Sequence, residues 1–213
     1  MTIDATTVIF LVALIIAVVL HELAHGVVAY RLGDDTAKRA GRLTLNPIKH
    51  MDPIGSFMLP LLGALSGLPV LGYAKPVPVN PARLRSPRRD MVLVALAGPG
   101  SNLLLASAGA LVARFTLPDP QATVDQWSDL HVVTRFAVAF ALVNLFLGLF
   151  NLIPIPPLDG SRLVERFLPV RWLPTWRRIT PYGFMIVFLV VLYGGADRIF
   201  DPAMRGLARF VRG

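Results

Sequence analysis

The sequence predicts an all-α polytopic membrane protein with about four transmembrane helices, a re-entrant segment and short β-strand-like loops near the cytoplasmic face. Hydrophobic residues make up 54% of the 213 residues and charged residues only 16%. The mean hydropathy is +0.61, which is too apolar for a small soluble or disordered chain. The apolar residues also gather in long uncharged runs, and a helix needs about 20 such residues to cross a bilayer.

Four runs are expected to span the membrane, and together they make residues 1–213 a single domain. The first is rich in Val, Ile and Leu and continues past three ionisable residues. The second and third contain long uncharged stretches, and the fourth is shorter but dense in Val, Phe and Leu. The predicted spans cover residues 5–30, 91–114, 133–157 and 180–197.

The stretch 53–74 is also uncharged, but prolines and glycines interrupt it. Such breaks favour a re-entrant segment over a straight span. The flanking loops agree, because residues 32–53 and 73–90 are both rich in Lys and Arg, which accumulate on the cytoplasmic side. A stretch with both ends on one side must dip into the membrane and return.

The other loops complete the orientation. Residues 159–180 are rich in arginine and are expected inside, whereas 116–130 carry aspartates without a basic residue and are expected outside. The N-terminus is then outside. The tail after residue 197 is also rich in arginine, so its side stays open. Because the basic residues lie in short loops, the net charge of +8 reflects orientation in a bilayer rather than binding of nucleic acid.

The first span contains a metal-binding pattern at positions 21–25, which read His-Glu-Leu-Ala-His. Residues four apart share one face of a helix, so His21 and His25 can chelate one ion. Glu22 lies beside them and is suited to act as a base. A lone histidine in an apolar helix is usually a core residue, but three ionisable groups together in a membrane segment are costly and indicate function.

A catalytic zinc site usually has three protein ligands and one open position. The chain has no cysteine, so the third ligand must be a histidine or a carboxylate. His50, His131 and Glu165 lie in loops or at a span edge, where a surface position is the ordinary interpretation.

Asp159 is the favoured third ligand. It follows the third span at the inside end, which the first span also reaches with His21 and His25. Three prolines just before it cannot continue a helix, so the chain is expected to unwind and turn Asp159 inward. The alternative is that Asp159 caps a helix or pairs with Arg162.

Three asparagines lie within the predicted spans. Asn144 and Asn151 are seven residues apart and share a helix face, and Asn102 offers an amide from the neighbouring span. Such amides either hold helices together or bind the scissile peptide and stabilise an oxyanion. Asn151 is the favoured substrate contact.

Three motifs together resemble the site-2 protease family of intramembrane zinc metalloproteases. They read HELAH at 21–25, AGPGSN at 97–102 and NLIPIPPLDG at 151–160. The loops at 41–55 and 72–81 resemble those of short prokaryotic members. No soluble block of domain size separates the spans, so a PDZ domain or a paired nucleotide-binding module is not expected.

The resemblance implies one Zn²⁺ per chain, bound by His21, His25 and Asp159, with Glu22 activating water and Asn151 near the substrate. It implies cleavage of a transmembrane segment in a single-span membrane protein, as in regulated intramembrane proteolysis. The expected location is the cell membrane, with the active site toward the cytoplasmic side.

Two rival functions remain. One is a membrane-embedded metal carrier or channel, which needs further ionisable groups along a path. The other is a catalytically inactive scaffold that binds membrane helices. The sequence leaves the oligomeric state open.

Overall fold

The computed structural model describes residues 4–58, 74–118, 128–193 and 195–213. Within these ranges the chain forms helices and turns and contains no β-strand, so the all-helical class is confirmed. The predicted strand-like loops are therefore not found in the described part of the chain. The segment 74–80 is irregular, and three prolines in or next to it remove the N–H groups that a strand ladder needs.

Three described helices are long and apolar enough to cross a membrane. They are α1 (Ala5–Arg31), α4 (Pro87–Thr116) and α5 (Val132–Leu152). The shortest has 21 residues, or about 32 Å at 1.5 Å per residue, which matches a hydrocarbon core of about 30 Å. The chain is therefore a multi-pass membrane protein, as predicted.

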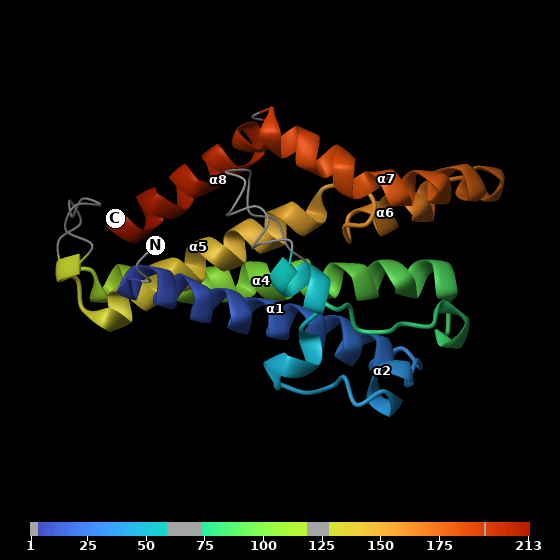
Figure 1. Ribbon diagram of the computed structural model, residues 1–213, viewed down its shortest axis with the longest axis horizontal. Coiled ribbons are helices and arrows are strands. Elements are labelled where there is room, and N and C mark those ends of the chain that lie inside the picture. The colour runs from blue at the N-terminus through green and yellow to red at the C-terminus, as the bar shows by residue number, and fades with distance from the viewer. Residues whose placement is uncertain (1–3, 59–73, 119–127, 194) are drawn as a thin grey trace.

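Small residues let these three helices pack closely, with α4 in contact with both α1 and α5 (Figure 1). A Cβ added to Gly109 of α4 would lie 3.1 Å from the backbone oxygen of Ala137 in α5. Membrane helices associate through such small residues because lipid provides no hydrophobic drive for packing. Small residues buried on these helices include Ala13, Ala17, Ala106, Ala110, Ala113, Ala137 and Ala141.

The ends of the later helices differ from the predicted spans. The third predicted span extends to residue 157, but α5 ends at Leu152 because Pro154 and the prolines after it cannot continue a helix. The fourth predicted span falls on two helices, α7 (Leu173–Leu192) and α8 (Gly195–Arg212), which meet at an angle in Figure 1. The Gly-Gly pair in the sequence at 194–195 favours a break there.

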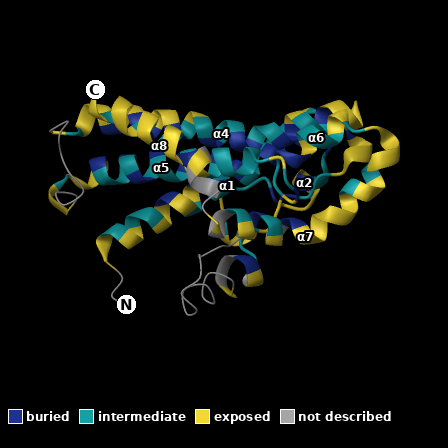
Figure 2. Ribbon diagram, turned by 90° about the horizontal axis from the view of Figure 1, so that it is seen from above, coloured by how far each residue is buried: buried dark blue, intermediate teal, exposed yellow. Residues whose placement is uncertain are grey.

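The C-terminal helix α8 lies along the bundle. Its Phe200 is buried and stacks on Phe146 of α5 with ring centroids 4.6 Å apart. Asp201 and Arg205 of this helix are exposed, and Figure 2 shows exposed residues along its length. The N- and C-termini lie at the same end of the molecule in both views.

The shorter elements gather mainly at the opposite end, where α2 and α6 lie in both views (Figures 1 and 2). The segments predicted to be cytoplasmic thus share one end of the bundle, away from both termini. The predicted re-entrant stretch 53–74 lies mostly outside the described residues. The shorter elements are α2 (Thr36–Arg39), η1 (Pro47–His50), η2 (Pro53–Met58), η3 (Pro81–Arg83), α6 (Ser161–Phe167) and η5 (Val170–Trp172).

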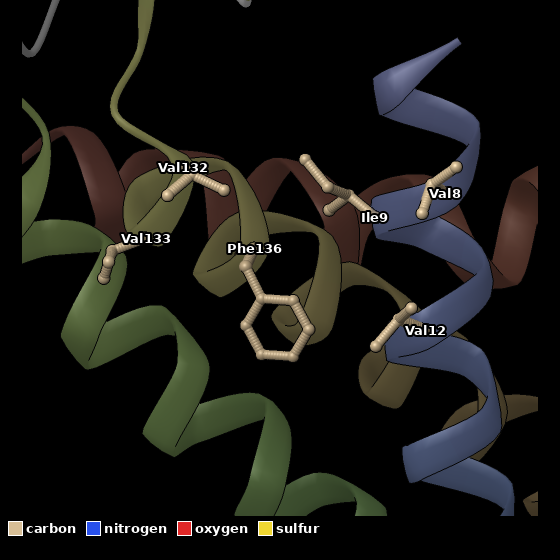
Figure 3. Close-up of a pocket in the computed structure, with 6 residues that line it drawn as sticks. All are labelled: Val8, Ile9, Val12, Val132, Val133 and Phe136. Atoms are coloured by element: carbon tan, nitrogen blue, oxygen red, sulfur yellow. The ribbon is translucent and has the colours of Figure 1, made fainter.

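A groove between α1 and α5 lies near the N-terminal end of α1 and is far from the ionisable residues of that helix. Figure 3 shows the side chains that line it, which all are apolar. It contains no group that can donate or accept a proton, so it offers no site for chemistry. The lining residues are Val8, Ile9, Val12, Val132, Val133 and Phe136.

Candidate metal centre

Three side chains from different parts of the chain converge beside α4. The Nε2 atoms of His21 and His25 lie 3.0 Å apart, and each lies 3.2 Å from Oδ2 of Asp159. Both histidines are buried. Ligand atoms about 2.0–2.1 Å from a tetrahedral zinc ion lie roughly 3.3 Å from one another. The triangle of Nε2, Nε2 and Oδ2 therefore has the size of one face of a zinc coordination tetrahedron.

The hydrogen bonds around the two imidazoles indicate which nitrogen carries the proton. His25 Nδ1 lies 2.6 Å from the backbone oxygen of Val94, and His21 Nδ1 lies 2.6 Å from Oδ1 of Asn102. Both partners are acceptors, so each Nδ1 donates and each Nε2 presents a lone pair. Oδ2 of Asp159 is buried without a hydrogen-bond partner. Three acceptor atoms thus face one another, an arrangement that a cation stabilises.

Two local structures produce this convergence. The i, i+4 spacing on α1 places both imidazoles on one helix face. The turn after α5 then carries Asp159 back, with the Gly160 N–H donating to the Asn151 oxygen at 2.7 Å. Arg162, the rival partner predicted for Asp159, pairs instead with Glu165 at 2.9 Å.

Gly98 of α4 forms the wall of the site opposite the imidazoles. A Cβ at this position would lie 2.3 Å from His25 Nε2 and 2.6 Å from His21 Nε2. These distances are too short for any side chain, so glycine is required for the close approach of α4 to α1.

We expect Gly98→Ala to lose zinc, because its methyl group would occupy the space between the imidazole nitrogens. The substitution favours helix by about 0.5–1 kcal/mol, so helix propensity cannot account for the loss. Gly100→Ala is the matched control, since nothing lies within 4 Å of its added Cβ. Metal analysis of both purified variants checks this, and full zinc occupancy in Gly98→Ala would contradict it.

Glu22 makes a contact that the sequence did not predict. Its Oε2 accepts a hydrogen bond from the Val77 N–H at 2.7 Å, and its other oxygen has no hydrogen-bond partner among the described residues. Val77 belongs to the irregular segment before α4. Nearby, Asp34 accepts from the Asn80 N–H at 2.6 Å and from the Thr36 N–H at 3.0 Å.

The hydrogen bonds of Asp34 give it a pH dependence. Burial alone raises the pKa of this carboxyl, but the Thr36 and Asn80 hydrogen bonds outweigh it, so the pKa lies below its ordinary value of 3.8. A lowered pKa in the folded state stabilises the fold above the unfolded pKa, and this stabilisation is lost as the pH falls through the folded pKa.

We therefore expect Asp34→Asn to destabilise the fold at pH 7 by about 1.5–3 kcal/mol, the range for hydrogen bonds to a charged group. The difference from the wild type should begin to shrink as the pH falls below about 4, where the carboxyl of the unfolded chain becomes protonated, and should vanish below the lowered pKa of the folded carboxyl. Thermal unfolding in detergent at several pH values measures this difference. A difference that is independent of pH would contradict the assignment.

Two of the predicted asparagines form a buried chain that ends at the first histidine. Asn102 accepts from His21 and donates to Oδ1 of Asn144 at 2.7 Å, and Asn144 donates to the Phe140 oxygen at 2.9 Å. Both side chains are fully buried. Outer partners of this kind fix the ring orientation and tautomer of a metal-binding histidine.

Asn151 lies at the last turn of α5 and donates to the Leu147 oxygen of its own helix at 3.0 Å. Its side chain is half-buried, and Asn151 also accepts the Gly160 N–H through its backbone. It therefore borders the turn that carries Asp159.

The other candidate residues lie elsewhere. His131 is exposed, as predicted, and caps α5, and Glu165 pairs with Arg162 as predicted but is half-buried. The surface prediction was wrong for His50, which is only 2% exposed. Its Nε2 lies 2.9 Å from the Thr44 oxygen, because the loop folds back over this ring.

A bundle of membrane-spanning helices with two histidines and an aspartate arranged around one point defines a membrane-embedded metalloprotein. The model of peptidase family M50 matches residues 9–194, and the chain belongs to this family of site-2 proteases. The sequence-based resemblance is thereby confirmed.

Relatives named as zinc metalloproteases agree. YwhC of Bacillus subtilis (strain 168) is 42% identical over 180 residues, which cover 84% of this chain and 78% of YwhC. Rip2 of Mycobacterium tuberculosis (strain ATCC 25618 / H37Rv) is 37% identical over 182 residues, which cover 84% of this chain and 64% of Rip2. Rip2 of Mycolicibacterium smegmatis (strain ATCC 700084 / mc(2)155) is 34% identical over 188 residues, which cover 85% of this chain and 65% of that protein. No solved structure matches the chain significantly.

Zn²⁺ is the cofactor that family membership implies, and the residues fit it. The nitrogen and carboxylate ligand set is one that zinc accepts, and the chain has no thiolate to compete. The unpartnered buried Oδ2 of Asp159 and the space kept open by Gly98 both lie where an ion would bind. His21, His25 and Asp159 can therefore hold it together.

Proposed function

We propose that this protein is a zinc-dependent intramembrane endopeptidase that cleaves a transmembrane segment of a single-span membrane protein. The observation that carries this proposal is the convergence of His21 Nε2, His25 Nε2 and Asp159 Oδ2, at 3.0–3.2 Å from one another. Family M50 membership supports a peptidase rather than a metal carrier.

The roles we assign follow from the contacts. His21, His25 and Asp159 bind the ion, and zinc when bound acts as a Lewis acid that lowers the pKa of water toward 7. Glu22 accepts the proton of the attacking water and passes it to the leaving amine. Its bond to Val77 fixes one carboxylate oxygen and leaves the other for this transfer.

The asparagines divide into two roles. Asn102 and Asn144 orient His21, since their amide groups are already engaged in the chain that ends at this ring. Asn151 remains the proposed substrate contact, because it borders the Asp159 turn and is half-buried.

The location of the site supports cleavage near the cytoplasmic side of the cell membrane. His25 lies six residues before the end of α1, about 9 Å along the helix axis, and thus below the end where the basic segments gather. By the positive-inside rule that end is cytoplasmic. We also propose that α7 and α8 together form the fourth membrane crossing, interrupted between the two helices, and that all four crossings belong to one domain.

The test is cleavage of candidate single-span proteins by the detergent-purified protein, with and without a chelator, followed by mass mapping of the cut. We expect a cut within the spanning segment that the chelator suppresses and that zinc restores. Stoichiometric zinc without cleavage of any reporter would favour the carrier or the inactive scaffold instead.

A further inference from the structure

The segment of residues 75–80, here called the strap, crosses α1 beside Glu22. We propose that Asp34 is a positioning residue of the peptidase: it holds the strap in place, and the strap in turn holds Glu22. This inference rests on the proposed function, because it assigns Glu22 the role of base. Asp34 itself touches the strap and not the reacting atoms.

The strap has few ways to be held, because its sequence is Lys-Pro-Val-Pro-Val-Asn. Its two prolines have no N–H, so only four amides can donate. Proline also restricts the residue before it to extended conformations, which keeps the strap from forming a helix. Its position must therefore come from bonds to other segments.

Four hydrogen bonds supply that position. At one end the Lys75 N–H donates to the His50 oxygen at 2.9 Å, and Arg42 Nη2 donates to the Lys75 oxygen at 2.7 Å. In the middle the Val77 N–H donates to Glu22, and at the other end the Asn80 N–H donates to Asp34. The bond to Glu22 is thus placed between two anchored ends.

Side-chain packing presses the strap against α1 at the same point. Val77 is only 7% exposed, and its Cγ1 would lie 3.1 Å from a Cβ added to Gly26 of α1. Gly26 is one residue after His25 and one helical turn from Glu22. The Val77 side chain and its N–H therefore dock on adjoining turns of the helix that carries the metal-binding motif.

Asp34 is suited to be the anchor at the second end. It is fully buried, and both of its oxygens are occupied: Oδ1 accepts the N–H and hydroxyl of Thr36, and Oδ2 accepts the Asn80 N–H. An asparagine at this position has only one acceptor oxygen, so its NH₂ group would face one of these donors. Asp34→Asn is thus the smallest change that releases one side.

Asp35 provides the matched control. It is the next residue, carries the same charge and pairs with Arg39 and Arg83, but its side chain is 40% exposed. Exposed ion pairs of this kind contribute little to stability. Asp35→Asn therefore removes one charge at the same place while leaving the strap bonds intact.

The test compares the zinc-loaded wild type, Asp34→Asn and Asp35→Asn in detergent. Amide hydrogen exchange with mass spectrometry is measured over the strap, and kcat and KM are measured with a cleavable single-span substrate. For Asp34→Asn we expect exchange at Val77 and Asn80 to rise by about 10-fold or more, and kcat to fall by about 10- to 100-fold, since small misplacements of a catalytic group have such effects. For the same variant, KM should change by less than about 2-fold and zinc should stay at one per chain. For Asp35→Asn, the exchange rates, kcat, KM and zinc content should all match the wild type.

Several results would overturn the inference. Unchanged exchange at Val77 in both Asp34→Asn and Asp34→Ala, the second of which has no acceptor for the Asn80 N–H, would show that Asp34 does not hold the strap, and this result does not depend on any cleavage. Faster exchange with unchanged kcat would show that the strap does not position Glu22. A raised KM with unchanged kcat would make the strap a substrate contact instead. Arg42→Met, which removes one of the two hydrogen bonds at the other end of the strap, should reproduce the loss of kcat if Asp34→Asn folds poorly. Failure of the wild type to cleave would count against the proposed function, whereas these comparisons address the strap.

Discussion

Glu22→Gln is expected to abolish cleavage while the protein keeps its fold and its zinc. The amide has nearly the shape of the carboxylate, and its oxygen can still accept the Val77 N–H that Glu22 accepts at 2.7 Å. It cannot accept a proton from water at neutral pH. Positioned general bases contribute about 10²- to 10⁴-fold to a rate, so kcat should fall by at least that range.

Two control measurements compare Glu22→Gln with the wild type: the amount of zinc bound per chain and the unfolding temperature. Both should be the same in the two proteins. Cleavage is followed by the appearance of the product fragment over time. Full turnover by Glu22→Gln would remove Glu22 from the mechanism and would leave the base unidentified.

Asp159→Asn is expected to release zinc and, with it, activity. The substitution removes the negative charge of a carboxylate that lies 3.2 Å from both imidazole nitrogens. Changing an outer partner of a ligand costs about 10- to 100-fold in metal affinity, and loss of a charged ligand should cost more. Titration with a competing chelator measures the affinity.

Glu165→Gln is the matched control for this variant. Glu165 lies on α6, a few residues after Asp159, and pairs with Arg162 at 2.9 Å. We expect its zinc affinity to equal that of the wild type. Equal affinity in Asp159→Asn would mean that the third ligand is another residue.

The sequence predicted those parts of the site that depend on local geometry or on topology. The spacing of His21 and His25 places them on one helix face whatever the rest of the fold does. Asp159 needed one further step, because three prolines end α5 before it and the direction of the spans brings both segments to the same end. Both arguments use features that are independent of side-chain packing.

The contacts of the amides and of the strap could not be predicted in this way. The bond from Asn102 to His21 depends on how α4 is rotated and shifted against α1, and these quantities are set by small residues such as Gly98. The bond from Val77 to Glu22 depends on a segment without helical or strand periodicity. Hydropathy and motif spacing carry no information about how α4 is rotated and shifted against α1, or about the path of the strap.

The helix ends show the same limit. Charge-free runs indicate where a chain enters lipid, but they do not show where backbone hydrogen bonds stop. The apolar run continues after α5 has ended at Leu152, and the last apolar run is divided between α7 and α8. Proline and glycine positions were the better guide to these ends.

X-ray absorption at the zinc edge tests the central claim most directly, because it reports the atoms bound to the ion. For the purified wild type we predict one zinc per chain, two imidazole ligands and only nitrogen and oxygen neighbours at about 2.0–2.1 Å. The Asp159→Asn protein reloaded with excess zinc should lose one oxygen neighbour. A spectrum with fewer than two imidazoles, or one that does not change in Asp159→Asn, would contradict a site built from His21, His25 and Asp159.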